Sequence, residues 1–249
     1  LGEKAVSRDI NSLAEMDNLN HANGVILAAE ELLADAYGAT HAFFTVNGTT
    51  LGIQVMIHCA CNPGDKILLP RNIHKSAMNA LIIGGFQPVY MQAEVSNEFG
   101  FVTGVTFETV KQSIIENPDA KAVFIINPTY YGVCSQLAEI IEYAHHLNIA
   151  VLCDEAHGSH FNFNDELPPS GMQLGADMSA TSIHKTGGAL TQASALLLNE
   201  GLISKEKVNE TLGLFHTTSP SYLLMCSLDM ARRNLAVRGK EMFDSILDE

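Results

Sequence analysis

Short apolar segments alternate with longer segments of helical pattern along most of this chain, and the alternation limits the fold more than any other feature. Residues 122–126 and 149–153 are apolar throughout, which is typical of strands covered on both faces. Segments that begin at a capping residue or end at a glycine lie between the strands, as helices do. The sequence therefore predicts an α/β fold with a mostly parallel sheet sandwiched by helices and right-handed crossovers.

The predicted elements cover most of the chain. We expect strands at 41–46, 66–69, 88–91, 122–126, 149–153 and 195–198, and helices at 23–38, 51–60, 71–83, 107–117, 136–147, 204–215 and 219–235. Gly38 should stop the first helix, Thr106 should cap the fourth, and Ser219 and Pro220 should start the last. We expect a lead-in segment at 1–22, one large domain at 23–235, and at 236–249 the start of a helix leading to an absent C-terminal domain.

Length and charge narrow the class of protein. The chain has 249 residues, of which 47% are hydrophobic, so it can bury the core of one large α/β domain. Its 14 basic and 28 acidic residues give a net charge of -14, which disfavours nucleic acid or an anionic membrane surface as a partner. Small-molecule chemistry is the function class that this composition favours.

The cysteines and the N-terminal residues indicate the cellular compartment. The five cysteines are odd in number and contain no C-x-x-C pair, which predicts reduced thiols in a cytoplasmic protein. No apolar run approaches the roughly 18 residues of a membrane span, and the first residues lack a signal-peptide pattern. Because the chain begins with Leu1 instead of methionine, we expect a fragment or a processed chain.

Lys185 is the strongest candidate for a catalytic residue. It lies in a polar, glycine-rich turn between two apolar segments, where a lysine can lose its charge. A neutral amine can condense with a carbonyl to form a Schiff base, and pyridoxal phosphate is the commonest partner for that chemistry. About thirty residues upstream, Asp154 follows an apolar strand. A pyridoxal enzyme needs such a carboxylate to keep its pyridine nitrogen protonated.

A candidate phosphate site precedes the second predicted helix. Asn47, Gly48, Thr49 and Thr50 form a turn that delivers hydroxyl groups to a helix N-terminus. Free N–H groups and the helix dipole favour an anion at such a position. The turn, His74, Thr129, Asp154 and Lys185 all follow strands or begin helices, so we expect them at the carboxyl edge of the sheet, where ligands bind in such folds.

Structural interpretations compete with these functional ones. Asp154 could cap a helix, and His74 could be an ordinary polar residue at a helix start. His157 and His160 suggest zinc, but no third ligand lies at metal spacing. The letters Asp-Glu-Ala-His also occur in a helicase box, yet the chain has no G-x-x-x-x-G-K-[ST] loop and its acidic balance opposes nucleic acid.

Seven segments in family order give a close resemblance. The chain resembles the Orn/Lys/Arg decarboxylases, pyridoxal-phosphate enzymes of the aspartate-aminotransferase fold (fold type I), through their large cofactor-binding domain. The matching segments are Phe43-Phe-Thr-Val-Asn-Gly-Thr-Thr50, Pro63-Gly-Asp65, Pro70-Arg-Asn-Ile-His-Lys-Ser76, Asn127-Pro-Thr-Tyr-Tyr-Gly132, Asp154-Glu-Ala-His-Gly158, Ser182-Ile-His-Lys-Thr186 and Thr217-Thr-Ser-Pro-Ser-Tyr222.

The resemblance implies a role for each matching residue. Lys185 would be the Schiff-base lysine, Asp154 would pair with the pyridine nitrogen, and His74 would stack on the cofactor ring. Residues that would hold or border the phosphate are Thr49, Thr50, Ser182 and His184, and the matching segments add Gly48, Thr129 and His157 to the cofactor-binding set. Thr217 and Thr218 would reach the cofactor of the neighbouring subunit in a homodimer or larger homo-oligomer. No metal is implied.

Three functions remain open at this point. The first is decarboxylation of a basic amino acid to its amine, with arginine first and lysine or ornithine next, as in polyamine biosynthesis. The second is another fold-type-I reaction, an aminotransferase or carbon-sulfur lyase. The third is a decarboxylase domain that folds without turnover, because family members are longer and carry further segments that complete the substrate pocket.

Overall fold

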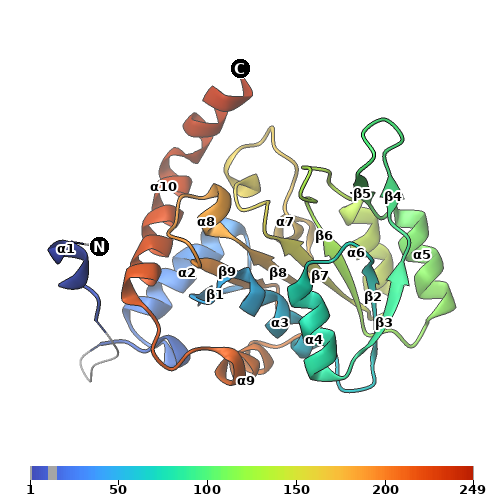
Figure 1. Cartoon of the computed structure of the whole chain (residues 1–249), viewed down its shortest axis with the longest axis horizontal. Coiled ribbons are helices and arrows are strands. Elements are labelled where there is room, and N and C mark those ends of the chain that lie inside the picture. Colours follow the sequence, from blue (N-terminus) through green and yellow to red (C-terminus); the bar gives the residue numbers. More distant parts are fainter. Residues whose placement is uncertain (1, 11–15, 249) are drawn as a thin grey trace.

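A central seven-stranded sheet organises the protein, in a computed structural model that describes residues 2–10 and 16–248. The strands are β1 (His41–Thr45), β2 (Lys66–Pro70), β3 (Gln87–Met91), β6 (Ala122–Ile126), β7 (Ala150–Glu155), β8 (Met178–Thr181) and β9 (Ser194–Leu198). Their order across the sheet is β1-β9-β8-β7-β6-β2-β3 (Figure 1). Neighbours from β3 to β8 run parallel, and β9 runs antiparallel to both β8 and β1. The predicted α/β fold with a mostly parallel sheet is confirmed.

Helices cover both faces of this sheet (Figure 1). The longer helices are α2 (Val25–Tyr37), α3 (Gly48–Ala60), α4 (Lys75–Gly84), α5 (Phe107–Glu116), α6 (Leu137–His146), α9 (Lys205–Phe215) and α10 (Tyr222–Leu247). The short ones are α1 (Glu3–Val6), α7 (Gly171–Leu174) and α8 (Ile183–Thr186), with single 3-10 turns at Leu19–His21 and Phe161–Phe163.

The strand alternation builds two separate apolar layers. Val123 and Ile125 of β6 join the layer under α2, α5, α6 and α10, while Phe124 joins the layer under α3, α4 and α9. All three side chains are fully buried. Successive strand residues point to opposite faces, so a strand that is apolar throughout needs cover on both sides. The sheet is thereby fixed between two helical layers, and its strand ends are left to form sites.

Local signals account for several boundaries. The Thr106 side chain accepts the Thr109 N–H and caps α5, and Ser204 caps α9 through the Lys207 N–H. Gly38 ends α2 in the left-handed region, with φ of 65°. These boundaries agree with the sequence.

Other boundaries differ from the prediction. Helix α3 begins at Gly48 instead of residue 51, and Asp154 lies inside β7 instead of after it. Strand β8 and the small antiparallel pair β4 (Glu94–Val95) and β5 (Val102–Gly104) have no counterpart among the predicted elements. These three strands have two to four residues, too few to show a period.

The last helix is longer than predicted and begins later. Helix α10 starts at Tyr222 after Ser221, whose side chain makes no cap hydrogen bond, and continues to Leu247 instead of ending near 235. It continues because its far half packs on the segment around Phe163. The Asn164 side chain donates to Asp244 Oδ1 at 2.7 Å, and a Cβ at Gly239 would lie only 2.7 Å from that of Phe163.

Within residues 2–10 and 16–248, no helix combines the length and the apolar character that crossing a bilayer requires.

Candidate active site

A cavity of about 1000 Å³ lies at the edge of the sheet where the parallel strands end. Ten of the twelve predicted site residues line it: Gly48, Thr49, Thr50, His74, Thr129, Asp154, His157, Ser182, His184 and Lys185. They come together because β1, β2, β6, β7 and β8 all deliver their following loop or helix to this edge. Thr217 and Thr218 do not line the cavity, and Thr218 is exposed.

Lys185 lies in α8, one short helix after β8. Its Nζ atom is 3.0 Å from Nε2 of His157. Partial burial lowers the pKa of the Lys185 ammonium, while the Asp154 carboxylate opposes that change. The lysine thus faces the cavity with a larger uncharged fraction than an ordinary surface lysine has.

Asp154 is held in the middle of the sheet by its backbone. It lies opposite Ile126 of β6 and Ala180 of β8, and it is 4% exposed. Desolvation raises its pKa to about 6. The Ala156 N–H, which donates to Oδ1 at 3.1 Å, and the charge of Lys185 both act to lower that pKa. Asp154 caps no helix here, so this structural alternative is wrong. A buried carboxylate at the floor of a cavity is suited to bind a cationic ring nitrogen.

Hydroxyl groups form a chain at another part of the cavity. Thr49 Oγ1 shares a hydrogen bond with Ser182 Oγ and donates to Ser194 Oγ at 3.0 Å. Ser194 Oγ lies 3.3 Å from Nδ1 of His184, which is also 3.0 Å from the Ala193 carbonyl oxygen. Ser194 is absent from the sequence-based set because it begins β9, the strand that runs against the others.

The first turn of α3 meets this hydroxyl chain. Gly48 takes φ of 72°, a left-handed conformation that favours glycine, and the Thr49 and Thr50 residues that follow it open the helix. Both threonines line the cavity, with Thr49 buried and Thr50 exposed. A helix N-terminus beside hydroxyl groups suits a phosphate.

His74 is the N-cap of α4 as well as a lining residue. Its Nδ1 atom accepts the Ser76 N–H at 3.3 Å and lies 2.8 Å from the Ser76 hydroxyl. Desolvation lowers its pKa, and Lys185 and Lys75 lower it further. The structural alternative of a polar helix start therefore describes the Nδ1 side of the ring, and the residue lines the cavity as well.

An aromatic wall closes the side near β5. Tyr131 stacks on Phe101 with centroids 4.2 Å apart, and Tyr130 lies edge-on to His157 at 5.4 Å. The Thr129 hydroxyl accepts the Val133 N–H and so secures the loop that carries both tyrosines. Sequence reasoning missed this wall, although Gly100 between Val95 and Val102 is a hairpin signal.

The zinc alternative has no geometric support. No three His, Cys, Asp or Glu side chains are arranged to hold a metal ion within the residues that the structure describes. His160 Nδ1 lies 3.2 Å from the Thr186 hydroxyl and His157 faces Lys185, so the two histidines have separate partners.

These groups fit pyridoxal phosphate. An amine of lowered pKa, a buried carboxylate, and a helix N-terminus with hydroxyl groups are the three functions that its aldehyde, ring nitrogen and phosphate require. All three line one cavity.

Comparison with known families gives a match over residues 1–249 to the family described as "Orn/Lys/Arg decarboxylase, major domain". The chain is 48% identical over 247 residues to an arginine decarboxylase of Bacillus subtilis (strain 168) and 46% identical to one of Bacillus anthracis, covering 99% of this chain in both cases. It spans half the length of each of these relatives.

Solved structures give the same relationship. Lysine decarboxylase A from Pseudomonas aeruginosa superposes with a TM-score of 0.88 at 26% identity, covering 99% of this chain and 36% of that one. The constitutive lysine decarboxylase of Escherichia coli superposes with a TM-score of 0.81. These similarities confirm the expected large-domain fold.

Proposed function

Since the chain belongs to the Orn/Lys/Arg decarboxylase family, we propose that it forms the catalytic large domain, at residues 23–235, of a pyridoxal-phosphate enzyme that decarboxylates a basic amino acid. Arginine is the preferred substrate, with lysine or ornithine next. One observation carries the proposal: Lys185 and Asp154 line the same cavity, the first with a lowered pKa and the second buried in the sheet.

The cofactor, when bound, supplies an electron sink for the bond pair that departing carbon dioxide leaves behind. Asp154 would hold the ring nitrogen protonated, because a buried carboxylate stabilises the positive charge of a protonated nitrogen beside it. Its pKa near 6 belongs to the free site, and a cationic partner lowers it. The acid is thereby kept ionised at neutral pH.

Lys185 would bind the cofactor's aldehyde carbon and later move protons near it. His157 Nε2, 3.0 Å from Nζ, would accept or return a proton as the amine changes state. Burial and the neighbouring Lys185 and His74 lower the pKa of His157, so its imidazole is mostly uncharged and can accept. The pair is therefore suited to keep the amine reactive.

The phosphate group would lie against the first turn of α3. Gly48, Thr49 and Thr50 would offer N–H and hydroxyl donors, and Ser182 and His184 would border the group from α8. Thr129 would orient the opposite loop and His74 would stack on the ring. These assignments are supported by the residues' common cavity.

The preference for arginine as substrate comes from the similarity of this chain to arginine decarboxylases. The matches at 46–48% identity that we report above are arginine decarboxylases, whereas the lysine decarboxylase LdcA of Pseudomonas aeruginosa is 30% identical over the same chain. This chain spans half the length of those proteins. The choice of arginine as substrate is therefore part of the proposal.

Two alternatives share the fold. Sphingomonas wittichii serine palmitoyltransferase superposes with a TM-score of 0.67 at 20% identity, so the fold alone does not select decarboxylation. An aminotransferase or carbon-sulfur lyase is the first alternative. A domain that binds cofactor without turnover is the second alternative.

For each of these functions we propose a cytoplasmic homodimer or larger homo-oligomer that binds neither nucleic acid nor membrane.

The deciding experiment incubates the protein with pyridoxal phosphate and, separately, with arginine, lysine and ornithine, while carbon dioxide and the amine are measured. A Lys185→Ala variant serves as the inactive control. Amine with equimolar carbon dioxide from arginine supports the proposal. A keto acid would indicate an aminotransferase, and no product in either protein would indicate a domain without turnover.

A further inference from the structure

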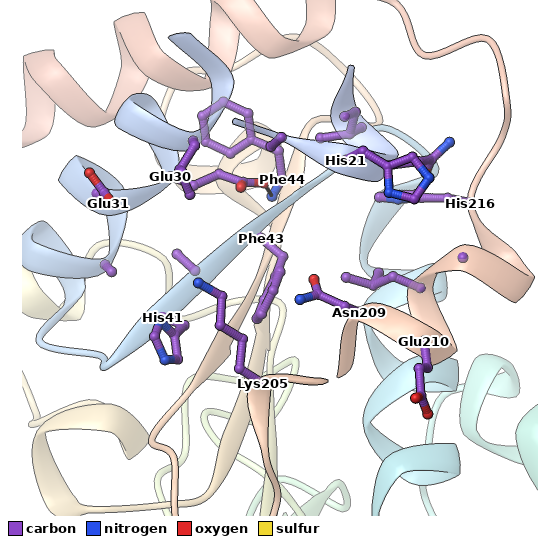
Figure 2. A pocket seen from close by; sticks show the side chains of 18 of the residues that line it. His21, Glu30, Glu31, His41, Phe43, Phe44, Lys205, Asn209, Glu210 and His216 are labelled. Carbon is purple, nitrogen blue, oxygen red and sulfur yellow. Dashed lines mark hydrogen bonds between the residues drawn. The ribbon is translucent and has the colours of Figure 1, made fainter. Parts of the chain in front are cut away.

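A second cavity, of about 630 Å³, lies beside β1 (Figure 2). It is enclosed by α2, the outer edge of β1, α9 and the turn at Leu19–His21. The two cavities have no lining residue in common. The proposed decarboxylation uses nothing in this second cavity.

Glu30 is the unusual group there. It is 7% exposed, and its Oε1 atom accepts the outward-facing N–H of Phe44 in edge strand β1 at 2.8 Å. Among the described residues only Oε1 has a hydrogen-bond partner, and Oε2 is open to the cavity instead of being a buried unpaired atom. A nearly buried carboxylate with one oxygen unused is costly unless a proton or a cation satisfies it.

The charges of the wall do not satisfy Glu30. The lining includes Glu30, Glu31 and Glu210 and one lysine, Lys205, which makes no ion pair within the described chain. Burial lowers the pKa of His216 to about 4, so this imidazole adds no positive charge at neutral pH. The lining carboxyl groups outnumber the one lysine, which opposes an anionic ligand.

Buried polar atoms without partners are also present in the wall. Within the described residues, Asn20 Oδ1 and His216 Nε2 are buried without a hydrogen-bond partner. Apolar side chains complete the lining: Leu19, Leu27, Ala34, Phe43, Phe44 and Leu212. Figure 2 shows Glu30 on the α2 side and Lys205 and Asn209 on the α9 side of the space between them.

We propose that this cavity is a second binding site, for a small organic cation with an apolar stem and a guanidinium or ammonium head held by Glu30. The head donates to the free Oε2 atom and the stem lies against the apolar part of the wall. The inference does not rest on the proposed decarboxylation, because it uses only the charge and contacts of the second cavity.

Butylguanidinium is the probe, since a guanidine does not condense readily with the cofactor's aldehyde, and isosteric butylurea is its neutral counterpart. Calorimetric titration of the cofactor-loaded protein at pH 9, above the Glu30 pKa of about 8, should detect butylguanidinium and no butylurea. Glu30→Gln keeps the acceptor for Phe44 N–H but loses the charge, and it should weaken binding about tenfold or more. Asp35→Asn, an equal charge change on the exposed side of α2, should leave binding unchanged.

Two further variants make the result independent of any folding defect in Glu30→Gln. Gly213→Leu places a side chain where an added Cβ meets nothing within 4 Å, so it should occupy the cavity and abolish binding without strain. Lys205→Met removes the competing cation and should strengthen binding by up to about fivefold. Equal binding of the urea, unchanged affinity in Glu30→Gln and Gly213→Leu, or weaker binding in Lys205→Met would each overturn the proposal.

Discussion

Nζ of Lys185 lies 3.0 Å from Nε2 of His157. Lys185 follows strand β8, and His157 follows strand β7. The same cavity places Asp154 within electrostatic reach of the lysine, where its carboxylate opposes the lowering of the lysine pKa. The reactivity of Lys185 is thus set jointly by a histidine that can accept its proton and a carboxylate that stabilises its charge.

Lys185 should carry the cofactor. Borohydride reduction of protein loaded with pyridoxal phosphate should leave a pyridoxyl group on Lys185, and the visible absorbance should bleach. The reason is that its lowered pKa leaves more uncharged amine than an ordinary lysine side chain has. Mass spectrometry of the peptides checks the position. A label on Lys75, which lines the same cavity, would contradict the assignment.

Asp154→Asn should lower the pKa of Lys185 further. The carboxylate raises that pKa, so the variant removes a stabiliser of the ammonium form. Because the neutral amine is the reacting species, labelling of Lys185 in the cofactor-free protein by an amine reagent should reach half its maximum at a lower pH than in the wild type. Asp119→Asn, an exposed carboxylate at the start of β6, should give the wild-type profile. A midpoint that moves upward would contradict this electrostatic account.

The same Asp154→Asn substitution should reduce decarboxylation about 100-fold or more in the full enzyme, since a neutral amide cannot favour a protonated ring nitrogen. Some cofactor should still bind, because the phosphate contacts remain. The rate constant at saturating substrate is the measurement. Near-normal turnover would mean that another residue pairs with the ring nitrogen.

The sequence was sufficient to place the site but not to give its contacts. Asp154, Lys185 and the turn at Gly48 could be assigned to one edge because parallel strands deliver their exits to the same side. Ser194 could not, because only tertiary pairing turns β9 against β8 and brings its start to that edge. The contact between His157 and Lys185 depends on side-chain directions that no spacing encodes.

The phosphate end can be tested by removing one hydroxyl group. Thr49→Val should weaken pyridoxal phosphate binding about tenfold, because Thr49 Oγ1 joins Ser182 and Ser194 and faces the anion in our proposal. Thr211→Val is the matched control, since that buried hydroxyl donates to the Lys207 carbonyl oxygen within α9 and does not line the cavity. Fluorescence titration measures both affinities. Equal affinities in the two variants would remove Thr49 from the phosphate site.

Glu30 should make stability depend on pH. Desolvation raises its pKa from 4.5 to about 8, although the Phe44 N–H and Lys205 oppose this and Asp17 adds to it. A raised pKa means that its stabilising contribution is full below pH 4.5 and is lost as pH rises through 8. Relative to Glu30→Gln, the wild type should therefore lose up to about 4 kcal/mol of unfolding free energy between pH 4.5 and 9. Denaturant titrations at both ends of the range measure it, and a difference that grows in the opposite direction would contradict the burial argument.

Thr217 and Thr218 lie outside the cavity that holds Lys185 in the same chain, and Thr218 is exposed. If they complete the site of a neighbouring subunit, as we propose, cofactor retention should fall when the protein is diluted below the dissociation constant of the dimer. Subunit mixing gives the sharper test.

The Lys185→Ala and Thr218→Glu variants, each assembled with itself, should retain little cofactor. The first lacks the amine, and in the second a carboxylate repels the phosphate bound by the partner subunit. In a mixed dimer, the Thr218→Glu subunit keeps its own Lys185 and receives an unaltered Thr218 from its partner. Mixing should therefore restore a borohydride-stable label on Lys185 of that subunit only. Retention that ignores dilution, or mixtures that recover no label, would show that each chain completes its own site.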